Sequence, residues 1–143
     1  MSKKIIVGML ILFLLLSSCA GSAGLVIWDE SIPEEETATV HFMNMKIDSF
    51  NGIHVTDFNR TRIPAGLARL GGEVRAVHAG LNFVLRDMEF SFNFEAGKSY
   101  MVSGATQNMQ WGVNVYDVTG QQSARATADN RIDFIPFREQ PVF

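Results

Sequence analysis

The sequence predicts an all-β fold, an antiparallel β-sandwich of about seven strands. Apolar and polar residues alternate with a period of two over several short segments, and turn-forming residues separate these segments every eight to twelve residues. Between residues 25 and 120 no segment has the apolar periodicity of an amphipathic helix. With 143 residues and 47% apolar composition, the chain suits one domain with an ordinary core.

The sandwich is expected to cover residues 37–118, and its first strand-like segment is Thr37–Ile47, which is rich in β-forming residues. Asn51-Gly52 is the preferred pair for a two-residue type I′ hairpin turn, because both positions need a positive φ. Residues 62–66 (Arg-Ile-Pro-Ala-Gly) are expected to form a turn that enters a strand over Leu67–Ala79. We expect Gly71-Gly72 to break that strand with a bulge.

The clearest alternation covers residues 88–95, where apolar and polar side chains fall on opposite faces of one strand. The apolar face carries Met88, Phe90, Phe92 and Phe94. Burial of such side chains stabilises a fold by about 1.5 to 3 kcal/mol each, so this strand is expected to be central to the core.

Ala96-Gly97-Lys98 is expected to be a turn, and a strand over Ser99–Thr106 follows it, with Tyr100 and Val102 pointing inward. Gly97-Lys98-Ser99 has the letters that end a phosphate-binding loop, but such a loop precedes a helix, whereas a strand is expected here. The segment is therefore interpreted as part of a hairpin.

A polar turn at residues 107–110 leads into the next strand, which carries Trp111, Val113 and Val115 on one face. Residues 119–143 are expected to form a polar loop and a C-terminal extension. A last strand over Arg131–Phe137 would belong to that extension.

The first eighteen residues have the pattern of a bacterial signal peptide. Lys3-Lys4 supplies positive charge before Ile5–Leu16, which is apolar except for Gly8. This run has about a dozen residues, whereas a helix that crosses a bilayer needs about twenty. We expect residues 1–18 to be removed, and residues 19–36 to join the domain to its attachment point as a flexible tether and acidic loop.

Leu16-Ser17-Ser18-Cys19 resembles the bacterial lipobox. The resemblance implies cleavage before Cys19 and acylation there, so that the lipid anchors the protein in a membrane of the cell envelope. A single acyl chain binds a membrane only marginally, and the several chains of a lipoprotein hold it firmly. Cys19 is the only cysteine, so the exported domain would have no disulfide. Ala20 stands where an Asp would favour the inner membrane, which points to the outer membrane.

The charge balance argues against nucleic acid as a partner. Residues 1–18 hold two lysines and no acidic residue, so the remaining chain has ten basic and fifteen acidic residues, a net charge of −5. Affinity for nucleic acid depends on clustered Lys and Arg, and the sequence has no such cluster.

The sequence identifies no catalytic residue, no cofactor and no metal site. His41, His54 and His78 lie on separate expected strands without the spacing of metal ligands. There is no Gly-x-Ser-x-Gly motif, and the one cysteine is assigned to lipid. The acidic residues between positions 29 and 36 are interpreted as a solvated loop, with paired glycosidase carboxylates, a calcium site or contact with a basic partner as the alternatives.

The aromatic residues outside the Phe-rich strand are candidates for contact with a ligand or partner: Trp28, Tyr100, Trp111 and Tyr116. Most of them are expected in the core. Trp111 follows a polar turn and is expected near an end of the sandwich, where binding loops gather. We therefore expect Trp111 to contact a partner.

Two segments resemble PEGA-like domains and related transthyretin-like sandwiches of bacterial envelope lipoproteins. They are Ile63-Pro64-Ala65-Gly66, before a strand, and Phe94–Tyr100, a strand end followed by a glycine turn and a tyrosine. The resemblance covers roughly residues 37–118 and implies a non-catalytic envelope module without an assigned site.

The resulting hypothesis is a lipid-anchored protein, not an enzyme, that binds or supports another envelope protein or a cell-wall component and faces the periplasm or the cell surface. Two alternatives stay open: an envelope hydrolase with an unrecognised site, and a carrier of lipid or a small molecule in a cavity lined by the phenylalanines.

Overall fold

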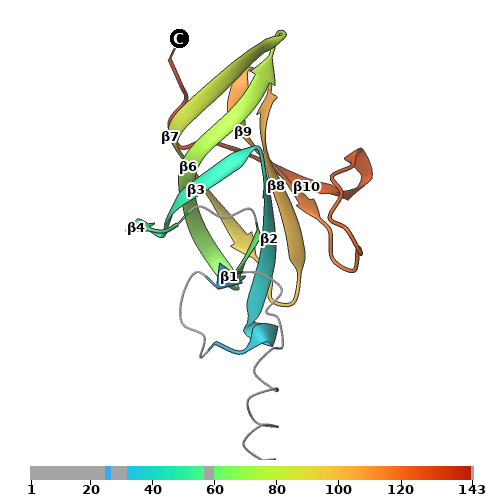
Figure 1. Cartoon of the computed structure of the whole chain (residues 1–143). Coiled ribbons are helices and arrows are strands. Elements are labelled where there is room, and N and C mark those ends of the chain that lie inside the picture. The colour runs from blue at the N-terminus through green and yellow to red at the C-terminus, as the bar shows by residue number, and fades with distance from the viewer. Residues whose placement is uncertain (1–24, 27–31, 57–59, 143) are drawn as a thin grey trace, which may run out of the picture.

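Figure 1 shows the computed structural model of the chain, which describes residues 25–26, 32–56 and 60–142. These residues form two β-sheets that pack together, with ten strands and two single turns of 3₁₀-helix. The all-β sandwich expected from the sequence is therefore confirmed. In this part of the chain no helix is long and apolar enough to cross a membrane. The expected signal peptide, Cys19 and Trp28 lie outside the described residues.

The larger sheet has six strands. In spatial order they are β1 (Leu25–Val26), β5 (Arg60–Pro64), β2 (Thr37–Met43), β8 (Ser99–Gln107), β9 (Gln110–Asp117) and β10 (Arg131–Pro136). Two neighbouring pairs are parallel, β1 with β5 and β2 with β8, and the others are antiparallel. Antiparallel pairing was expected throughout, and the difference arises because all strands of the other sheet lie between β2 and β8 in the chain.

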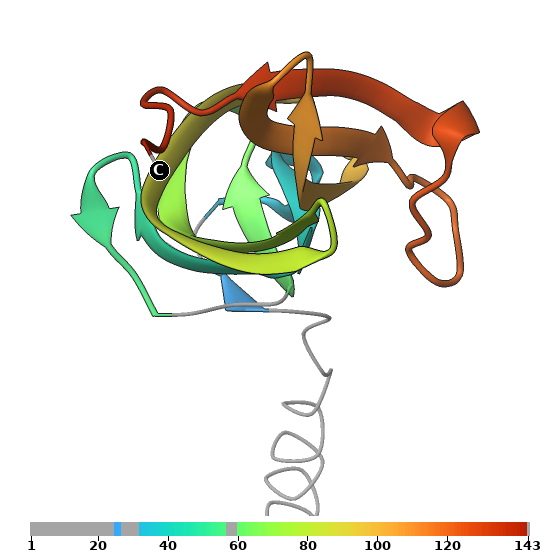
Figure 2. The same ribbon diagram turned by 90° about the horizontal axis from the view of Figure 1, so that it is seen from above.

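The smaller sheet has four strands and is antiparallel throughout. In spatial order they are β4 (Ile53–His54), β3 (Met45–Phe50), β6 (Gly66–His78) and β7 (Leu81–Phe94). Figure 2 shows that both sheets curve, so that their concave faces surround one core. The strands outnumber the seven or so expected, partly because β1 and β4 have two residues each.

The segment expected to form one strand over Thr37–Ile47 is divided at Asn44, which has a φ of 58°. The chain passes there from the larger sheet to the smaller one. Buried apolar side chains fall on even positions before the break and on odd positions after it: Ala38, Val40, Phe42, Met45 and Ile47. This change of phase explains why both faces of the segment are partly apolar in the sequence.

Residues 62–66 do not form the expected turn. Most of this segment belongs to β5, which pairs with β2 so that Ile63 lies opposite Ala38. Thr61 and Ile63 are completely buried, and this burial outweighs the turn preference of the sequence. Pro64 is tolerated because it is the last residue of its strand.

The sheet is irregular at Gly71-Gly72, where a bulge was expected, but the strand is not broken, because β6 continues through both residues. The irregularities lie on the two strands that pair with β6. An extra residue, Asp48, interrupts the register of β3, and β7 has its own register shift near Asp87, whose φ is 55°. A Cβ atom on Gly72 would collide with the carbonyl oxygen of Lys46, so the close approach of β3 to β6 requires glycine there.

The expected aromatic ladder of β7 is confirmed. Phe90 and Phe94 are 3% and 1% exposed, and Phe92 is half-buried beside them. The rings of Phe92, Phe94 and Tyr100 contact one another edge-on, with centroids 4.9–5.5 Å apart. The side chains expected to point inward from β8 and β9 are also buried: Tyr100, Val102, Trp111, Val113 and Val115.

Three hairpins close through two-residue turns in which both residues have a positive φ: Asn51-Gly52, Ala79-Gly80 and Asn108-Met109. The first is the type I′ turn expected from the sequence. The third falls within the expected polar turn at residues 107–110. No turn was expected at Ala79-Gly80, which joins the two longest strands, β6 and β7.

The C-terminal extension adds a strand to the larger sheet. Between β9 and η2 (Ala128–Asn130) the chain is irregular, as expected for a polar loop. The further strand expected over Arg131–Phe137 is confirmed as β10, which pairs with β9. Phe137, directly after it, is buried in the common core.

The sandwich has two ends. The proximal end, at the bottom of Figure 1, holds η1 (Glu34–Glu36) and the β7–β8 turn at residues 95–98. The distal end holds the Asn44 corner and the tips of the β6–β7 and β8–β9 hairpins. The two ends differ in the side chains that they expose.

Candidate functional site

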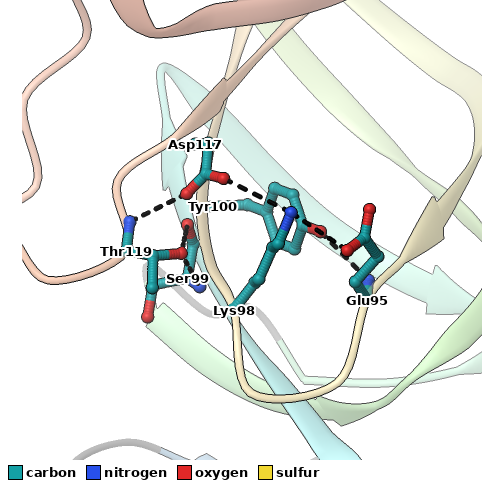
Figure 3. Close-up of polar contacts among 6 residues, drawn as sticks. All are labelled: Glu95, Lys98, Ser99, Tyr100, Asp117 and Thr119. Atoms are coloured by element: carbon teal, nitrogen blue, oxygen red, sulfur yellow. Dashed lines mark hydrogen bonds and ion pairs between the residues drawn. The ribbon is translucent and has the colours of Figure 1, made fainter.

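A cluster of polar residues occupies the proximal end around Lys98, as Figure 3 shows. Its members, called the Lys98 cluster below, are Glu95, Lys98, Ser99, Tyr100, Asp117 and Thr119. The Lys98 ammonium lies 2.9 Å from a Glu95 carboxylate oxygen and 3.7 Å from one of Asp117. It therefore joins the β7–β8 turn to the end of β9.

Hydrogen bonds complete this connection. The Glu95 main-chain N–H donates to the Tyr100 hydroxyl oxygen over 3.0 Å. The Ser99 N–H donates to the Thr119 hydroxyl oxygen, and the Thr119 N–H donates to the Asp117 carboxylate, each over 3.0 Å. Burial raises the pKa of Tyr100, so its hydroxyl stays protonated at neutral pH. These contacts join the β7–β8 turn, the start of β8 and the end of β9, so the cluster fixes strand ends and turns.

The geometry around Lys98 also shows that Gly97-Lys98-Ser99 is not part of a phosphate-binding loop. Gly97 and Lys98 lie in a turn between two strands, and Ser99 is the first residue of β8. Hydrogen bonding to Glu95 raises the pKa of Lys98 and holds its charge against a carboxylate of the same turn. The interpretation of this segment as part of a hairpin is confirmed.

Acidification is expected to remove a stabilising contribution of Asp117. Hydrogen bonds from Thr119, with a smaller effect of the Lys98 charge, lower the pKa of Asp117 below its ordinary value of 3.8. A carboxyl group with a lowered pKa in the folded state stabilises the fold above pH 3.8, and this stabilisation is lost as the pH falls through the folded-state pKa. The free energies of unfolding of the wild type and Asp117→Asn, measured from pH 7 to pH 2, should therefore converge below about pH 4. A difference that does not change with pH would contradict this assignment.

The distal end contains a hollow of about 550 Å³ between the β6–β7 hairpin, the Asn44 corner and β8, called the distal hollow below. Its lining includes the apolar side chains of Ala76, Val77, Phe83 and Val84. Three polar residues also line it: Asn44, Arg75 and Asn82. Gly104 of β8 completes the wall, and a Cβ atom there would collide with the side chain of Val74. The volume lies within the range of about 300 to 1,000 Å³ that is typical of ligand sites.

A second, smaller hollow of about 260 Å³ lies beside Trp111 at the same end. Its lining includes His78 and the β8–β9 turn, Asn108-Met109. The indole ring lies 5.5 Å from the Phe83 ring and 5.7 Å from the His78 ring, centroid to centroid. The main chain of Trp111 is held by Gln140, which accepts from its N–H and donates to its carbonyl oxygen. Trp111 is 9% exposed, so little of its surface is open to this hollow.

The distal end also exposes large apolar side chains. Their exposed fractions are 69% for Val77, 62% for Leu81, 52% for Val84 and 99% for Met109. The only charged residues between positions 74 and 86 are Arg75 and Arg86, and there are none between 103 and 115. The domain is acidic as a whole, but the tips of both distal hairpins contain no carboxylate.

The other residues that the sequence singled out do not come together. His41 lies on β2, His54 is exposed on β4, and His78 lies at the distal tip of β6. Within residues 32–56 and 60–142, no group of three His, Cys, Asp or Glu side chains could hold a metal ion. Glu34, Glu35 and Glu36 are exposed on η1, and Glu34 pairs with Arg62 over 3.2 Å.

Sequence reasoning missed the distal hollow. Its walls come from three separate parts of the chain, namely the Asn44 corner, the β6–β7 hairpin and Gly104 of β8. One signal for part of it was present: Ala79-Gly80 is a turn-forming pair, and the residues after it, Leu81 to Leu85, are mostly apolar. That pattern is typical of a hairpin that extends beyond the body of a sandwich.

Comparison with known proteins gives no relative for this fold and site. The chain matches no protein-family model, and no curated protein or solved structure is significantly similar to it. The class to which the chain belongs is therefore defined by its own structure: an all-β sandwich of two sheets with hollows at one end.

Proposed function

We propose that the chain is a lipid-anchored protein of the bacterial cell envelope that works by non-catalytic binding at the distal end of its sandwich. The observation that carries the proposal is the grouping of two hollows and four exposed apolar side chains at that end. Exposed apolar residues gathered around a concave surface are typical of interaction sites. The envelope location is supported by the signal-peptide pattern and by the lipobox-like Leu16-Ser17-Ser18-Cys19.

The orientation of the domain supports the same proposal. The chain enters the described fold at β1 and η1, toward the proximal end. A lipid at Cys19 would attach the domain to a membrane from that side and leave the distal end facing outward. The PEGA-like resemblance agrees with a non-catalytic module, and Trp111, the residue expected to contact a partner, lies at the distal end.

The two alternatives receive less support. The side chains that line the two hollows include one histidine, His78, and neither a serine nor a carboxylate, which favours binding over hydrolysis. A carrier was expected to hold its cargo against the phenylalanine ladder. Phe90 and Phe94 are instead packed in the core, and neither hollow is lined by them.

One experiment in a native-type bacterial host tests both parts of the proposal. For the anchor, Cys19→Ala is expected to abolish incorporation of labelled palmitate and to leave the precursor unprocessed, because the thiol that accepts the lipid is lost. Ser18→Ala is the matched control and should still be acylated and cleaved, since the lipobox needs only a small residue there. Normal processing of Cys19→Ala would refute the anchor.

For the binding surface, a photoreactive benzoylphenylalanine replaces Met109 at the distal end or Leu67 near the proximal end, both highly exposed. Irradiation of intact cells should give a discrete cross-linked product from position 109 and none from position 67. Equal yields from the two positions, or no product from position 109, would contradict binding at the distal end.

A further inference from the structure

The wall of the distal hollow includes a strand edge that this chain leaves without a partner. The Arg75 N–H donates to the Asn44 carbonyl oxygen over 2.8 Å, so the main-chain groups of Arg75 point toward the side of β3. Because these directions alternate along a strand, the N–H and C=O of Val77 point to the same side. β3 begins only at Met45, and the preceding chain belongs to the other sheet.

Val77 therefore presents one donor and one acceptor at the hollow, and neither has a partner among the described residues. An unpaired strand edge of this kind accepts a further strand in many peptide-binding domains. Asn44 and Asn82 line the same hollow, and their side-chain amides can also both donate and accept.

The charge beside this edge is positive. Glu73 pairs with Arg75 over 3.5 Å and with Arg86 over 3.7 Å, so one carboxylate is shared by two guanidinium groups. Arg75 lines the hollow, and its side chain is 75% exposed. Its planar, fork-like group is suited to a second carboxylate.

We propose that the distal hollow binds an extended peptide segment that carries a carboxylate, added as a short strand to β6 beyond Asn44. The peptide main chain pairs with Val77, its carboxylate pairs with Arg75 on one face, and an apolar side chain lies on the other face against Ala76 and Phe83, which are cross-strand partners. A fatty acid or another apolar anion would form an ion pair with Arg75 but has no hydrogen-bond donor for the Val77 carbonyl oxygen. The strand edge therefore favours a peptide. The inference rests on the proposed function, since it names the class of ligand for the distal end.

The test uses a library of random heptapeptides displayed on phage, selected against the full chain reconstituted in phospholipid nanodiscs. Selected sequences should contain Asp or Glu near an apolar residue, and the strongest of them is then synthesised as the probe. Titration of this peptide should show binding that is weakened about tenfold by Arg75→Gln, as expected for loss of a hydrogen bond to a charged group. Arg86→Gln is the matched control, because Arg86 shares Glu73 but does not line the hollow.

Val77→Pro removes the free N–H, and proline is tolerated where a strand N–H points away from its ladder. It should weaken the same peptide about tenfold, whereas Val77→Thr, which keeps the N–H, should bind within about twofold of the wild type. The unfolding midpoint shows whether Val77→Pro is folded. If it is not, the effect of Arg75→Gln on peptide binding alone tests the inference.

Three results would overturn the inference: no peptide enriched over empty nanodiscs, peptide binding that Arg75→Gln leaves unchanged, or oleate bound with an affinity that Val77→Pro does not alter. The proposed function is tested separately from this inference, by cross-linking at position 109. If position 109 still cross-links to a partner in the Arg75→Gln, Val77→Pro double variant, the distal end binds, but not through the hollow.

Discussion

Phe94→Ala is expected to lower the free energy of unfolding by about 3 to 5 kcal/mol, the usual cost of removing a buried phenylalanine ring. Phe94 is 1% exposed, and its ring contacts the rings of Phe92 and Tyr100. It also lies opposite Gly66, which has no side chain to fill the space that the ring would leave. Since domains of this size are stable by only about 5 to 15 kcal/mol, the variant should be largely unfolded well below the wild-type midpoint.

Urea unfolding followed by tryptophan fluorescence measures this loss. Phe92→Ala is the matched control, because it removes the same ring from a half-buried position on the same face of β7. Its loss should be smaller than that of Phe94→Ala. Equal losses at the two positions would show that the ladder does not continue into the core as described.

Gly72→Ala is expected to destabilise the domain by about 3 kcal/mol or more, although it adds a single methyl group. The new Cβ would collide with the Lys46 carbonyl oxygen and would also lie 3.0 Å from the Ile47 Cα. Main-chain atoms of a paired strand cannot move aside as a flexible side chain does, so β3 would have to separate from β6.

Gly120→Ala is the control for this prediction. A Cβ there has nothing within 4 Å, and only its φ of +78° is unfavourable, which costs about 1 to 2 kcal/mol. Gly72 also has a positive φ, +158°, so both variants carry backbone strain. The larger loss of Gly72→Ala than of Gly120→Ala in thermal unfolding therefore measures the collision. A similar loss in both would mean that β3 and β6 are not as close as Gly72 requires.

The sequence predicted well the segments whose local pattern allows one conformation. Along residues 88–95 the period of two holds without interruption, and Asn51-Gly52 permits few conformations besides its turn. The pattern fails where the chain changes sheets. At Asn44 the buried positions change from even to odd, so an averaged pattern looks apolar on both faces.

The segment around Pro64 shows a second limit of sequence reasoning. Proline and glycine at positions 64 and 66 favour a turn locally, but the burial of Thr61 and Ile63 places the segment in β5. This burial arises from pairing with β2, about twenty residues earlier in the chain, so it cannot be predicted from the local sequence around Pro64. The parallel pairing of β2 with β8 is hidden for the same reason.

The candidate site could be predicted only in part. Trp111 was expected near an end of the sandwich, and it lies beside the smaller hollow. The distal hollow depends on where β3 begins along β6, at Met45 opposite Val74, and this register is not encoded by any sequence motif. The lipobox-like segment is the opposite case: its four residues imply a chemistry directly, and the lipid at Cys19 stays a prediction.

The parallel pairing of β2 with β8 has a mechanical consequence for a tethered domain. Tension between a membrane anchor at Cys19 and a partner held at the tip of the β8–β9 hairpin would enter through β1 and the start of β2 and leave through that hairpin. The ladder between β2 and β8, which joins Thr39–Met43 to Ser99–Ser103, would then be loaded in shear, with its hydrogen bonds sharing the force. Such a domain resists pulling along its long axis more strongly than peeling from the β10 edge.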